Sequence, residues 1–378
     1  MKIAIVGGHL TPALALIDEL KNEKLFFIGR KNSFEGDSSL SLEFRTIRET
    51  GIPFVHLRTG RLQRKVGKHF LPSLLKIPFG LFQALIILLK NKPDVVLSFG
   101  GYLSVPVGLA AFFLKIPLII HEQTMEAGLA NKLLSRFAAK ICISWKQSLE
   151  FFPREKTVLT GNPIRKFSIL SGKGGYISSG NSQFSISNEH LPLIYITGGS
   201  AGAHAINLLV ESCLEDLLNR YSIIHQTGDN KEFSDYERLN NNIKSLPEEL
   251  RRRYVLKKFI EHTDIGNIMS DAALIISRSG INTVTELLYF GKPCFLIPLP
   301  AGQKNEQLKN ARFIKKVGIG NFMIQEDLTP KLFLKKIEAI FESISMYKEH
   351  AEYARSLVVK DAANNISNTI YEVASKKN

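Results

Sequence analysis

Two glycine-rich turns are the parts of this chain best suited to chemistry on a ligand. The first, Gly7-Gly8, follows the apolar residues 2–6, and the second, Gly198-Gly199, follows the apolar residues 193–197. A glycine turn between a strand and a helix directs free backbone N–H groups and the positive end of the helix at one point in space. One such turn in each half of the chain predicts two similar α/β domains with a ligand cleft between them.

His9 comes directly after the first turn and shortly before Pro12, a residue that suits an early position in a helix. A neutral imidazole placed at a cleft can accept a proton from a substrate hydroxyl. The sequence therefore makes His9 a candidate general base, with a capping or packing histidine as the alternative.

The second turn, at residues 198–203, has neither the Lys-Ser/Thr ending of a Walker A loop nor a clean GxGxxG spacing. Its small residues, the Ser200 hydroxyl and the helix expected after it nevertheless suit a phosphate group. A phosphate-binding turn and a purely structural turn both remain open from this segment alone.

Polar side chains follow two later strands of the second half. Arg278-Ser279-Gly280 comes directly after the expected strand 274–277, and Glu286 lies in the helix that follows. A carboxylate can accept two hydrogen bonds from the paired hydroxyls of a ribose, so Glu286 is a candidate nucleotide-binding residue, or else an exposed helix glutamate. Three further side chains suit sugar hydroxyls, unless they are only solvated: Glu306, Gln307 and Asn310.

The elements that must position these residues alternate between short β-rich runs and helical patterns, as parallel βαβ units require. Most of the expected strands are near-continuous apolar runs, which predicts helices on both faces of each sheet. The expected strands are 3–6, 25–28, 95–99, 118–121, 141–144, 158–160, 193–197, 223–226, 255–259, 274–277, 294–298 and 322–324. A linker is expected at 171–188, which is rich in Gly, Ser and Asn, and a long, broken helical stretch at 332–373.

The composition is that of an ordinary globular protein, with 44% apolar and 22% charged residues in 378, enough for two domains. The three cysteines lie far apart without metal-ligand spacing, which favours buried, reduced thiols over disulfides or zinc. The chain begins at once with a strand, which leaves no room for a signal peptide. The most apolar stretch, 74–89, is interrupted and falls short of the roughly 20 residues that span a bilayer. We therefore expect a soluble or peripheral protein.

The net charge of +14 is concentrated in part in residues 50–93, which contain eight lysines and arginines and no acidic residue. Apolar side chains are interleaved with these charges, most densely from Arg58 to Phe82. This combination favours an anionic membrane surface. Nucleic acid is a weaker alternative because aliphatic rather than stacking aromatic residues dominate. A third interpretation is a buried helix that is preceded by a solvated basic loop, without any ligand.

Taken together, several segments resemble the MurG family, the glycosyltransferases that complete lipid II in bacterial cell-wall synthesis. The resemblance covers nearly the whole chain. It is carried by GGHLTPALA, SFGGYLSVPVGLAA, IPLIIHEQTMEAGLANKLL, TGNPIR, ITGGSAGAHAIN, SRSGINTVTELLYFGKPCFLIPLP and NEQLKNA, in the family's order.

The resemblance implies the GT-B fold, an α/β architecture in which two Rossmann-like domains with parallel sheets face each other across a cleft. The expected domains are an acceptor- and membrane-facing domain at 1–163, a UDP-GlcNAc-binding domain at 164–345, and a helical segment at 346–378 that packs back toward the first. The implied reaction moves GlcNAc from UDP-GlcNAc to the muramyl 4-hydroxyl of lipid I with inversion. It also implies a peripheral enzyme at the cytoplasmic face of the cell membrane, with cell-wall synthesis proteins as possible partners. No DxD-type metal motif is evident, and no cofactor is expected beyond the substrate UDP-GlcNAc.

The family's functional positions map onto residues of this chain. His9 is implied near the reacting centre as a base candidate. Acceptor-binding residues are implied at Tyr102, His121, Glu122 and Asn131. Donor-binding residues are implied at Gly7, Gly8, Arg165, Gly199, Ser200, Phe259, Ile260, Arg278, Ser279, Gly280, Glu286, Gln307 and Asn310. Among these, Arg165, Gly199 and Ser200 are implied at the diphosphate, Phe259 and Ile260 at the uracil, Glu286 at the ribose, and Gln307 and Asn310 at GlcNAc.

Four features depart from the family's usual pattern. The first glycine loop is shorter and lacks its threonine, Thr124 replaces the Asn of HEQN, Ala201 replaces a Gln, and Glu306 replaces a His or Gln. The competing functions are another GT-B glycolipid transferase, a sugar-nucleotide epimerase of the same architecture, and a non-catalytic nucleotide-sugar binder. An epimerase would convert UDP-GlcNAc without a lipid, whereas a binder would hold it without transfer.

Overall fold

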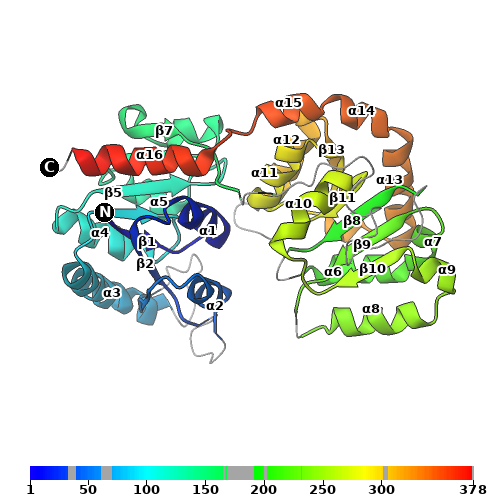
Figure 1. Ribbon diagram of the computed structural model, residues 1–378, viewed down its shortest axis with the longest axis horizontal. Coiled ribbons are helices and arrows are strands. Elements are labelled where there is room, and N and C mark those ends of the chain that lie inside the picture. The colour runs from blue at the N-terminus through cyan, green and yellow to red at the C-terminus, as the bar shows by residue number, and fades with distance from the viewer. Residues whose placement is uncertain are drawn as a thin grey trace. The chain divides into compact units, whose positions relative to one another are not determined.

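The computed structural model describes residues 1–32, 40–60, 70–164, 167, 191–199, 202–230, 232–300 and 305–376, without the side chains of 70–77 and 262. The chain divides into two compact units (Figure 1). The first unit comprises Met1–Arg165 and Val359–Asn378, and the second comprises Lys166–Val358. The linker expected at 171–188, together with Arg165, Ser200 and Ala201, lies outside the described residues.

The first unit is built on a parallel sheet of seven strands in the order β3-β2-β1-β4-β5-β6-β7. The strands are β1 Lys2–Val6, β2 Lys24–Gly29, β3 Phe54–His56, β4 Val95–Ser98, β5 Leu118–Glu122, β6 Lys140–Ile143 and β7 Thr157–Leu159. The helices are α1 Leu10–Glu19, α2 Leu42–Glu49, α3 Phe70–Asn91, α4 Ser104–Phe113, α5 Leu129–Leu134 and α16 Ala362–Ser375, with short 3-10 turns η1 Lys146–Phe151 and η2 Arg154–Lys156. The strand order reverses between β1 and β4, the point at which open α/β sheets bind ligands.

Both faces of this sheet are covered, as the continuous apolar strands predict. Ala4 and Val6 of β1 belong to one core, with residues of α3, α4 and α5, while Ile3 and Ile5 belong to another, with residues of α1 and α16. Alternate side chains of a strand point to opposite faces, so a strand that is apolar throughout needs two such layers. α16, red in Figure 1, packs against α1 and returns the C-terminal end of the chain to the first unit.

The second unit repeats this plan with six parallel strands in the order β10-β9-β8-β11-β12-β13. The strands are β8 Leu193–Thr197, β9 Ser222–Gln226, β10 Tyr254–Lys257, β11 Leu274–Ser277, β12 Cys294–Leu296 and β13 Gly320–Phe322. The helices are α6 His204–Ser212, α7 Leu214–Leu218, α8 Asp235–Lys244, α9 Glu248–Arg251, α10 His262–Asp271, α11 Ile281–Phe290, α12 Glu306–Val317, α13 Pro330–Glu342, α14 Ile344–Glu349 and α15 Ala351–Ser356, with a 3-10 turn η4 at Gln325–Asp327. The order reverses between β8 and β11, so the second glycine turn lies at a reversal point as the first one does.

Several sequence expectations differ from the structure, and two of the expected strands, 255–259 and 294–298, end two residues later than β10 and β12 do. The edge strand β3 was not expected, because it has only three half-buried residues. The last strand, β13, lies two residues earlier than expected, since Cys294 pairs with Gly320. The second unit extends to Val358 rather than to residue 345. Its last helix, α15, packs against α11, and Arg355 donates from Nη2 to the Phe290 carbonyl at 3.1 Å, so only the chain from Val359 onward belongs to the first unit.

Cys142, Cys213 and Cys294 are free and buried, in line with the expectation of reduced thiols. Among the helices that the structure describes, none combines the length and the apolar character needed to span a bilayer.

Candidate functional site

In the first unit, the turn after β1 touches the loop after β4 at the reversal point of the sheet. A Cβ atom on Gly8 would lie 2.3 Å from the carbonyl oxygen of Gly100, far inside van der Waals contact. Gly100 itself has a φ of +81°, in the left-handed region that favours glycine. Glycine is therefore required at both positions, Gly8 and Gly100. Their close approach places the backbone before His9 directly against the loop before Tyr102.

Glu43, from the first turn of α2, reaches over the same glycine turn. Its Oε2 accepts from the Arg30 backbone N–H at 3.2 Å. Its Oε1 occupies the space in which a Cβ atom on Gly7 would stand, at 2.1 Å. Burial raises the pKa of Glu43, opposed in part by hydrogen bonds from the backbone of Arg30 and Gly8. Sequence reasoning missed this residue because α2 is joined to β2 by residues that carry no motif.

His9 occupies the N-cap position of α1 with extended backbone, and its side chain makes no capping hydrogen bond. Burial lowers the pKa of the imidazole to about 4. The ring is consequently neutral near pH 7 and has a lone pair that can accept a proton. Because the side chain makes no capping hydrogen bond, the alternative of a capping histidine is wrong. The packing histidine and the general base both stay predictions.

His121, at the end of β5, is buried and 3.1 Å from the Gly161 carbonyl through Nε2, with Ser144 Oγ at 3.2 Å from the same nitrogen. Because a carbonyl only accepts, Nε2 carries the ring proton in this arrangement. Nδ1 is buried and has no partner among the described residues. Burial, with a smaller contribution from the nearby His9, lowers the pKa of His121 to about 4. The first unit therefore holds two neutral imidazoles at one edge of its sheet.

Glu122 organises the loop that follows β5. Its Oε1 accepts from the backbone N–H and the hydroxyl of Thr124, at 3.0 and 2.6 Å, and its Oε2 accepts from Gly128 N and Asn131 Nδ2, at 2.8 and 3.0 Å. Asn131 Nδ2 also donates to the His121 carbonyl at 3.1 Å. Thr124, the residue that departs from the family pattern, is thus an integral part of the network.

The four predicted acceptor residues differ in accessibility. His121, Glu122 and Asn131 are at most 3% exposed, and Tyr102 is half-buried against the core beside α3 and α4. Asn131 Oδ1, like His121 Nδ1, is a buried polar atom without a described partner. The structure brings His121, Glu122 and Asn131 together as the support of the loop after β5, whereas Tyr102 lies in the loop after β4. Direct contact with an acceptor stays a prediction for all four residues.

In the second unit, the glycine turn after β8 is shaped by two left-handed residues. Gly199 and Gly202 have φ values of +77° and +76°. Gly199 N donates to Thr197 Oγ1 at 3.0 Å, and a Cβ atom on Gly202 would lie 2.2 Å from the Thr227 carbonyl oxygen. α6 begins immediately after the turn, and the N-cap residue Ala203 has no side chain that could satisfy its first N–H groups. This end of α6 is suited to an anion.

A cavity of about 510 Å³ opens at this turn, a volume typical of small-molecule sites. It is lined by loops at the carboxyl ends of β8, β9, β11, β12 and β13. Within the described part of the chain its lining includes Arg278 and His204 but no carboxylate. The cavity therefore suits a negatively charged ligand.

Arg278 is held in the cavity wall by neutral acceptors. Its Nη1 donates to the Ile297 carbonyl at 3.1 Å, and its Nη2 donates to Gln325 Oε1 at 2.7 Å. Burial lowers the pKa of Arg278, offset in part by Glu326, yet a guanidinium remains charged near neutral pH. It is therefore a fixed positive charge in the cavity wall.

Ser279, Gln307 and Asn310 tie the loops after β11 and β12 to α12. Ser279 Oγ donates to the Gln307 carbonyl at 2.8 Å, and Asn310 Nδ2 donates to the Ser279 carbonyl at 2.9 Å. Gln307 Oε1 accepts from Leu299 N at 2.9 Å while the residue lines the cavity. Asn310 is 1% exposed, so its described role is to hold Ser279 in place.

The remaining predicted donor residues lie apart from the lining of this cavity. Phe259 is 51% exposed after β10, and the backbone N–H of Ile260 donates to Gln226 Oε1 at 3.2 Å. Glu286 is buried within α11, so the alternative of an exposed helix glutamate is wrong. Contacts with uracil and ribose stay predictions.

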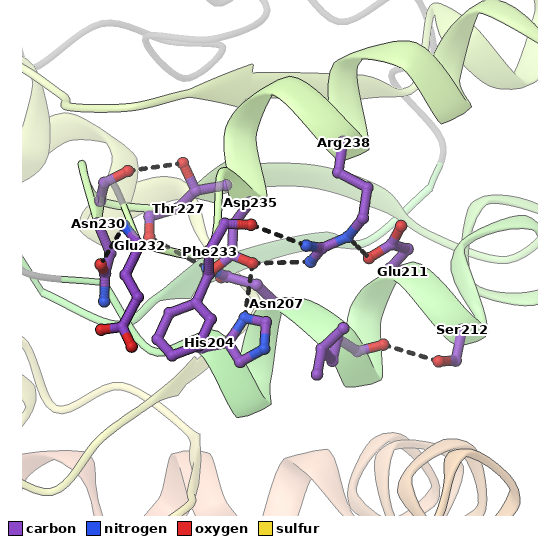
Figure 2. A network of polar contacts seen from close by, with 12 residues as sticks. His204, Asn207, Glu211, Ser212, Thr227, Asn230, Glu232, Phe233, Asp235 and Arg238 are labelled. Atoms are coloured by element: carbon purple, nitrogen blue, oxygen red, sulfur yellow. Dashed lines mark hydrogen bonds and ion pairs between the residues drawn. The ribbon is translucent and has the colours of Figure 1, made fainter.

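Sequence reasoning missed one wall of the cavity altogether. His204, Asn230 and Phe233 line it, and His204 Nδ1 lies 2.7 Å from Oδ1 of the buried Asp235 (Figure 2). His204 and Asp235 are separated by a strand and belong to different helices, so no local pattern connects them. The only signal was the position of His204 directly after the glycine turn.

Comparison with known proteins agrees with this architecture. Residues 6–143 match the glycosyltransferase family 28 N-terminal domain, and residues 193–366 match its C-terminal domain. A relative from Clostridium kluyveri, a UDP-N-acetylglucosamine--N-acetylmuramyl-(pentapeptide) pyrophosphoryl-undecaprenol N-acetylglucosamine transferase, is 35% identical and covered over 98% of each chain. The crystal structure of MurG from Acinetobacter baumannii is similar with a TM-score of 0.72 and 26% identity, over 98% of this chain and 100% of that one. The chain belongs to the MurG family. It is a glycosyltransferase with the GT-B fold.

A more distant likeness concerns the fold alone. The UDP-GlcNAc 2-epimerase of Neisseria meningitidis, solved with UDP-GlcNAc bound, has a TM-score of 0.62 at 15% identity, over 98% of this chain and 100% of that one. At this identity the likeness says nothing about which reaction the MurG-family chain performs.

Proposed function

We propose that this MurG-family chain transfers GlcNAc from UDP-GlcNAc to the 4-hydroxyl of MurNAc in undecaprenyl-diphosphate-MurNAc-pentapeptide, lipid I, and so forms lipid II. The observation that carries the proposal is the full-length similarity to a transferase of that name. The chemistry of the two units supports it, since one holds neutral imidazoles and the other a cation-lined cavity at a glycine turn.

The donor is assigned to the second unit. Its diphosphate meets the glycine turn after β8, the first N–H groups of α6 and Arg278, while a diphosphate contact of Arg165, the last residue of the first unit before the linker, stays a prediction. Glu286 takes the ribose, Phe259 and Ile260 flank the uracil, and Gln307 and Asn310 orient GlcNAc. As the bond from the anomeric carbon to the phosphate oxygen breaks, negative charge grows on UDP, and these positive groups stabilise it.

The acceptor is assigned to the first unit. The MurNAc 4-oxygen attacks the anomeric carbon from the side opposite UDP, which inverts the configuration in one displacement. The proton of that hydroxyl passes to the neutral imidazole of His9. The loop held by Glu122 supports the acceptor side through His121 and Asn131, and Tyr102 adds to it from the loop after β4.

The experiment that tests this function uses purified protein, labelled UDP-GlcNAc and a lipid I analogue, and it measures a disaccharide product. Incubation with the donor alone is the control for an epimerase, which would convert UDP-GlcNAc without the lipid. Saturable binding of UDP-GlcNAc without any transfer would contradict the proposal and indicate a nucleotide-sugar binder.

We further propose that the first unit docks on the cytoplasmic, anionic face of the membrane through the region from Arg58 to Phe82 and the exposed face of α3. Four large apolar side chains on this helix, at spacings that place them on one side, are 48–63% exposed: Phe79, Phe82, Ile86 and Leu89. An apolar stripe next to a basic stretch suits a membrane surface. Residues 61–69 of that stretch lie outside the described residues.

The docking proposal has a direct test in sedimentation with anionic vesicles. Replacing Phe79 and Phe82 by Ser should weaken binding at all salt concentrations, whereas replacing Arg61, Arg64, Lys65 and Lys68 by Ser should weaken it mainly at low salt. Met346, an apolar side chain of the second unit that is 62% exposed, is the matched control for replacement by Ser. Unchanged vesicle binding in both multiple variants would contradict the docking surface.

A further inference from the structure

Asp235, the first residue of α8, is the centre of a polar network in the second unit (Figure 2), and its partner His204 lines the cavity. Its Oδ1 accepts from Arg238 Nη2 and pairs with His204 Nδ1, both at 2.7 Å, and its Oδ2 accepts from Asn207 Nδ2 at 2.7 Å. Burial by itself raises the pKa of Asp235, but the hydrogen bonds from Asn207, Arg238 and His204 outweigh burial and hold the pKa below its ordinary value. Asp235 is therefore an ionised carboxylate at a fixed position.

His204 and Arg238 both meet Oδ1 of Asp235. Arg238 also donates from Nε to Glu211 at 2.6 Å, so one guanidinium serves two carboxylates. Nδ1 of His204 is the other group that Oδ1 of Asp235 meets, and no further described cation pairs with Asp235. Because a carboxylate only accepts, Nδ1 carries the hydrogen of this contact.

His204 is also fixed in the plane of its ring. It stacks on Phe233 with ring centroids 3.9 Å apart and an interplanar angle of 10°. Both rings line the cavity, and the side chain of His204 is 29% exposed. Nε2 lies on the edge of the ring away from the contact with Asp235 and has no partner among the described residues. The aromatic stack and the carboxylate together determine where this nitrogen is.

The rest of the cavity indicates the kind of ligand that this nitrogen meets. Arg278 supplies a cation to the lining, the glycine turn supplies backbone N–H groups, and the described lining contains no carboxylate. A ligand group with two or more anionic oxygens fits this arrangement. The diphosphate of a sugar nucleotide is such a group.

We propose that His204 is a further donor-binding residue of this chain, whose Nε2 donates a hydrogen bond to a diphosphate oxygen of the sugar nucleotide. Asp235 and Phe233 act through it as positioning residues. The inference rests on the proposed function, because it takes UDP-GlcNAc as the ligand of the second unit. It adds a residue in α6, with its own support, to the glycine turn and arginines already assigned to the diphosphate.

The test compares the affinities of UDP and uridine, measured as inhibition constants against UDP-GlcNAc with the full chain. In His204→Gln the affinity for UDP should fall about tenfold, the loss expected for one hydrogen bond to a charged group. The affinity for uridine, which has no phosphate, should stay unchanged. His204→Arg supplies a cation at this position and should recover most of the UDP affinity. If histidine had only a structural role, both variants would lose UDP affinity.

Two further variants separate charge from folding. Asp235→Asn keeps the shape of the network and removes the negative charge that fixes Nδ1 of His204. It should therefore lower UDP affinity, with little further loss when combined with His204→Gln. Glu211→Gln is the matched control, because it touches Arg238 and not His204, and it should leave the UDP-to-uridine ratio as in the wild type.

The outcomes distinguish a failure of the inference about His204 from a failure of the proposed transferase function. An unchanged UDP-to-uridine ratio in His204→Gln, in a protein that still transfers GlcNAc, would overturn the inference alone. A wild-type protein that neither binds UDP nor transfers GlcNAc would overturn the proposed function and the inference with it.

Discussion

Replacing His9 by Asn should abolish most of the transfer activity while leaving donor binding intact. Positioned general bases contribute about 10²- to 10⁴-fold to a rate, so kcat should fall by that order and the UDP inhibition constant should not change. Asn keeps a polar side chain at the N-cap position, where His9 makes no capping hydrogen bond, so the stability of the fold should be nearly unaffected. His350, an exposed histidine of the second unit, is the control for the same replacement.

The pH dependence makes this prediction sharper. Burial lowers the pKa of His9 from 6.5 to about 4. At about pH 6 a base with a pKa near 4 is about 1% protonated, whereas one with the ordinary value is about three-quarters protonated. The base form is lost only as the pH falls through about 4, so kcat should stay flat between about pH 8 and pH 5.

The assay is the initial rate of disaccharide formation at saturating donor and acceptor, over a range of pH and in detergent without a membrane. Two results would refute the reasoning. One is a His9→Asn variant that keeps kcat within about threefold of the wild type, since that loss is far below a general-base contribution. The other is an acid limb near pH 6.5 that disappears in the same variant, because it would mean that the ring is not desolvated.

Three more predictions concern stability and the loops. His121 and His225, which burial keeps neutral with pKa values of about 4 and about 3, bind protons only on unfolding as the pH drops below 6.5. The free energy of unfolding should therefore fall by about 1 kcal/mol for each between about pH 7 and pH 5.5 in urea titrations, and a His225→Gln variant with the wild-type slope would contradict this. Gly202→Ala should lower the melting temperature and the UDP affinity, because the φ of Gly202 is +76° and the Thr227 carbonyl blocks a Cβ atom. Gly280→Ala is the control and should melt like the wild type, because a Cβ atom there meets nothing within 4 Å. Glu122→Gln should cost about 1.5–3 kcal/mol of unfolding free energy, since an amide cannot accept all four hydrogen bonds, and a loss no larger than that of the exposed Glu150→Gln would argue against the network.

The sheets could be predicted from the sequence because their central strands are apolar on both faces. β1, β4, β8 and β11 are almost entirely buried, and such runs are visible without any partner strand. The edge strand β3 was missed because its three half-buried residues owe their conformation to pairing with β2. β13 was misplaced because its position is fixed by pairing of Gly320 with Cys294, after Gly318 ends α12 in a left-handed conformation.

The candidate site could be predicted only where the chemistry follows a strand directly. The glycine turns, His9 and Arg278 all come within a few residues of a strand that ends at the ligand-binding edge. His204 and Asp235 were missed as a pair because they are 31 residues apart and meet only through the packing of α6 and α8. Glu43 was missed for the same reason, since the void left by Gly7 and Gly29 that it fills is a property of the folded sheet.

The two units use the same turn for opposite electrostatic purposes. In the first, the space at the turn is filled by Gly100 and Glu43, and burial keeps His9 and His121 without charge. In the second, the turn opens into a cavity whose lining, within the described residues, contains the cation Arg278 and the side chain of His204 but no carboxylate. A transferase needs both environments, because a base must be neutral to take a proton from the acceptor hydroxyl, whereas a leaving diphosphate must meet positive charge. Placing a positive charge where the base must be neutral should therefore lower kcat at least as much as removing the base. A lysine in place of His9 would bring a cation to the acceptor, and its kcat should fall at least as far as that of His9→Asn.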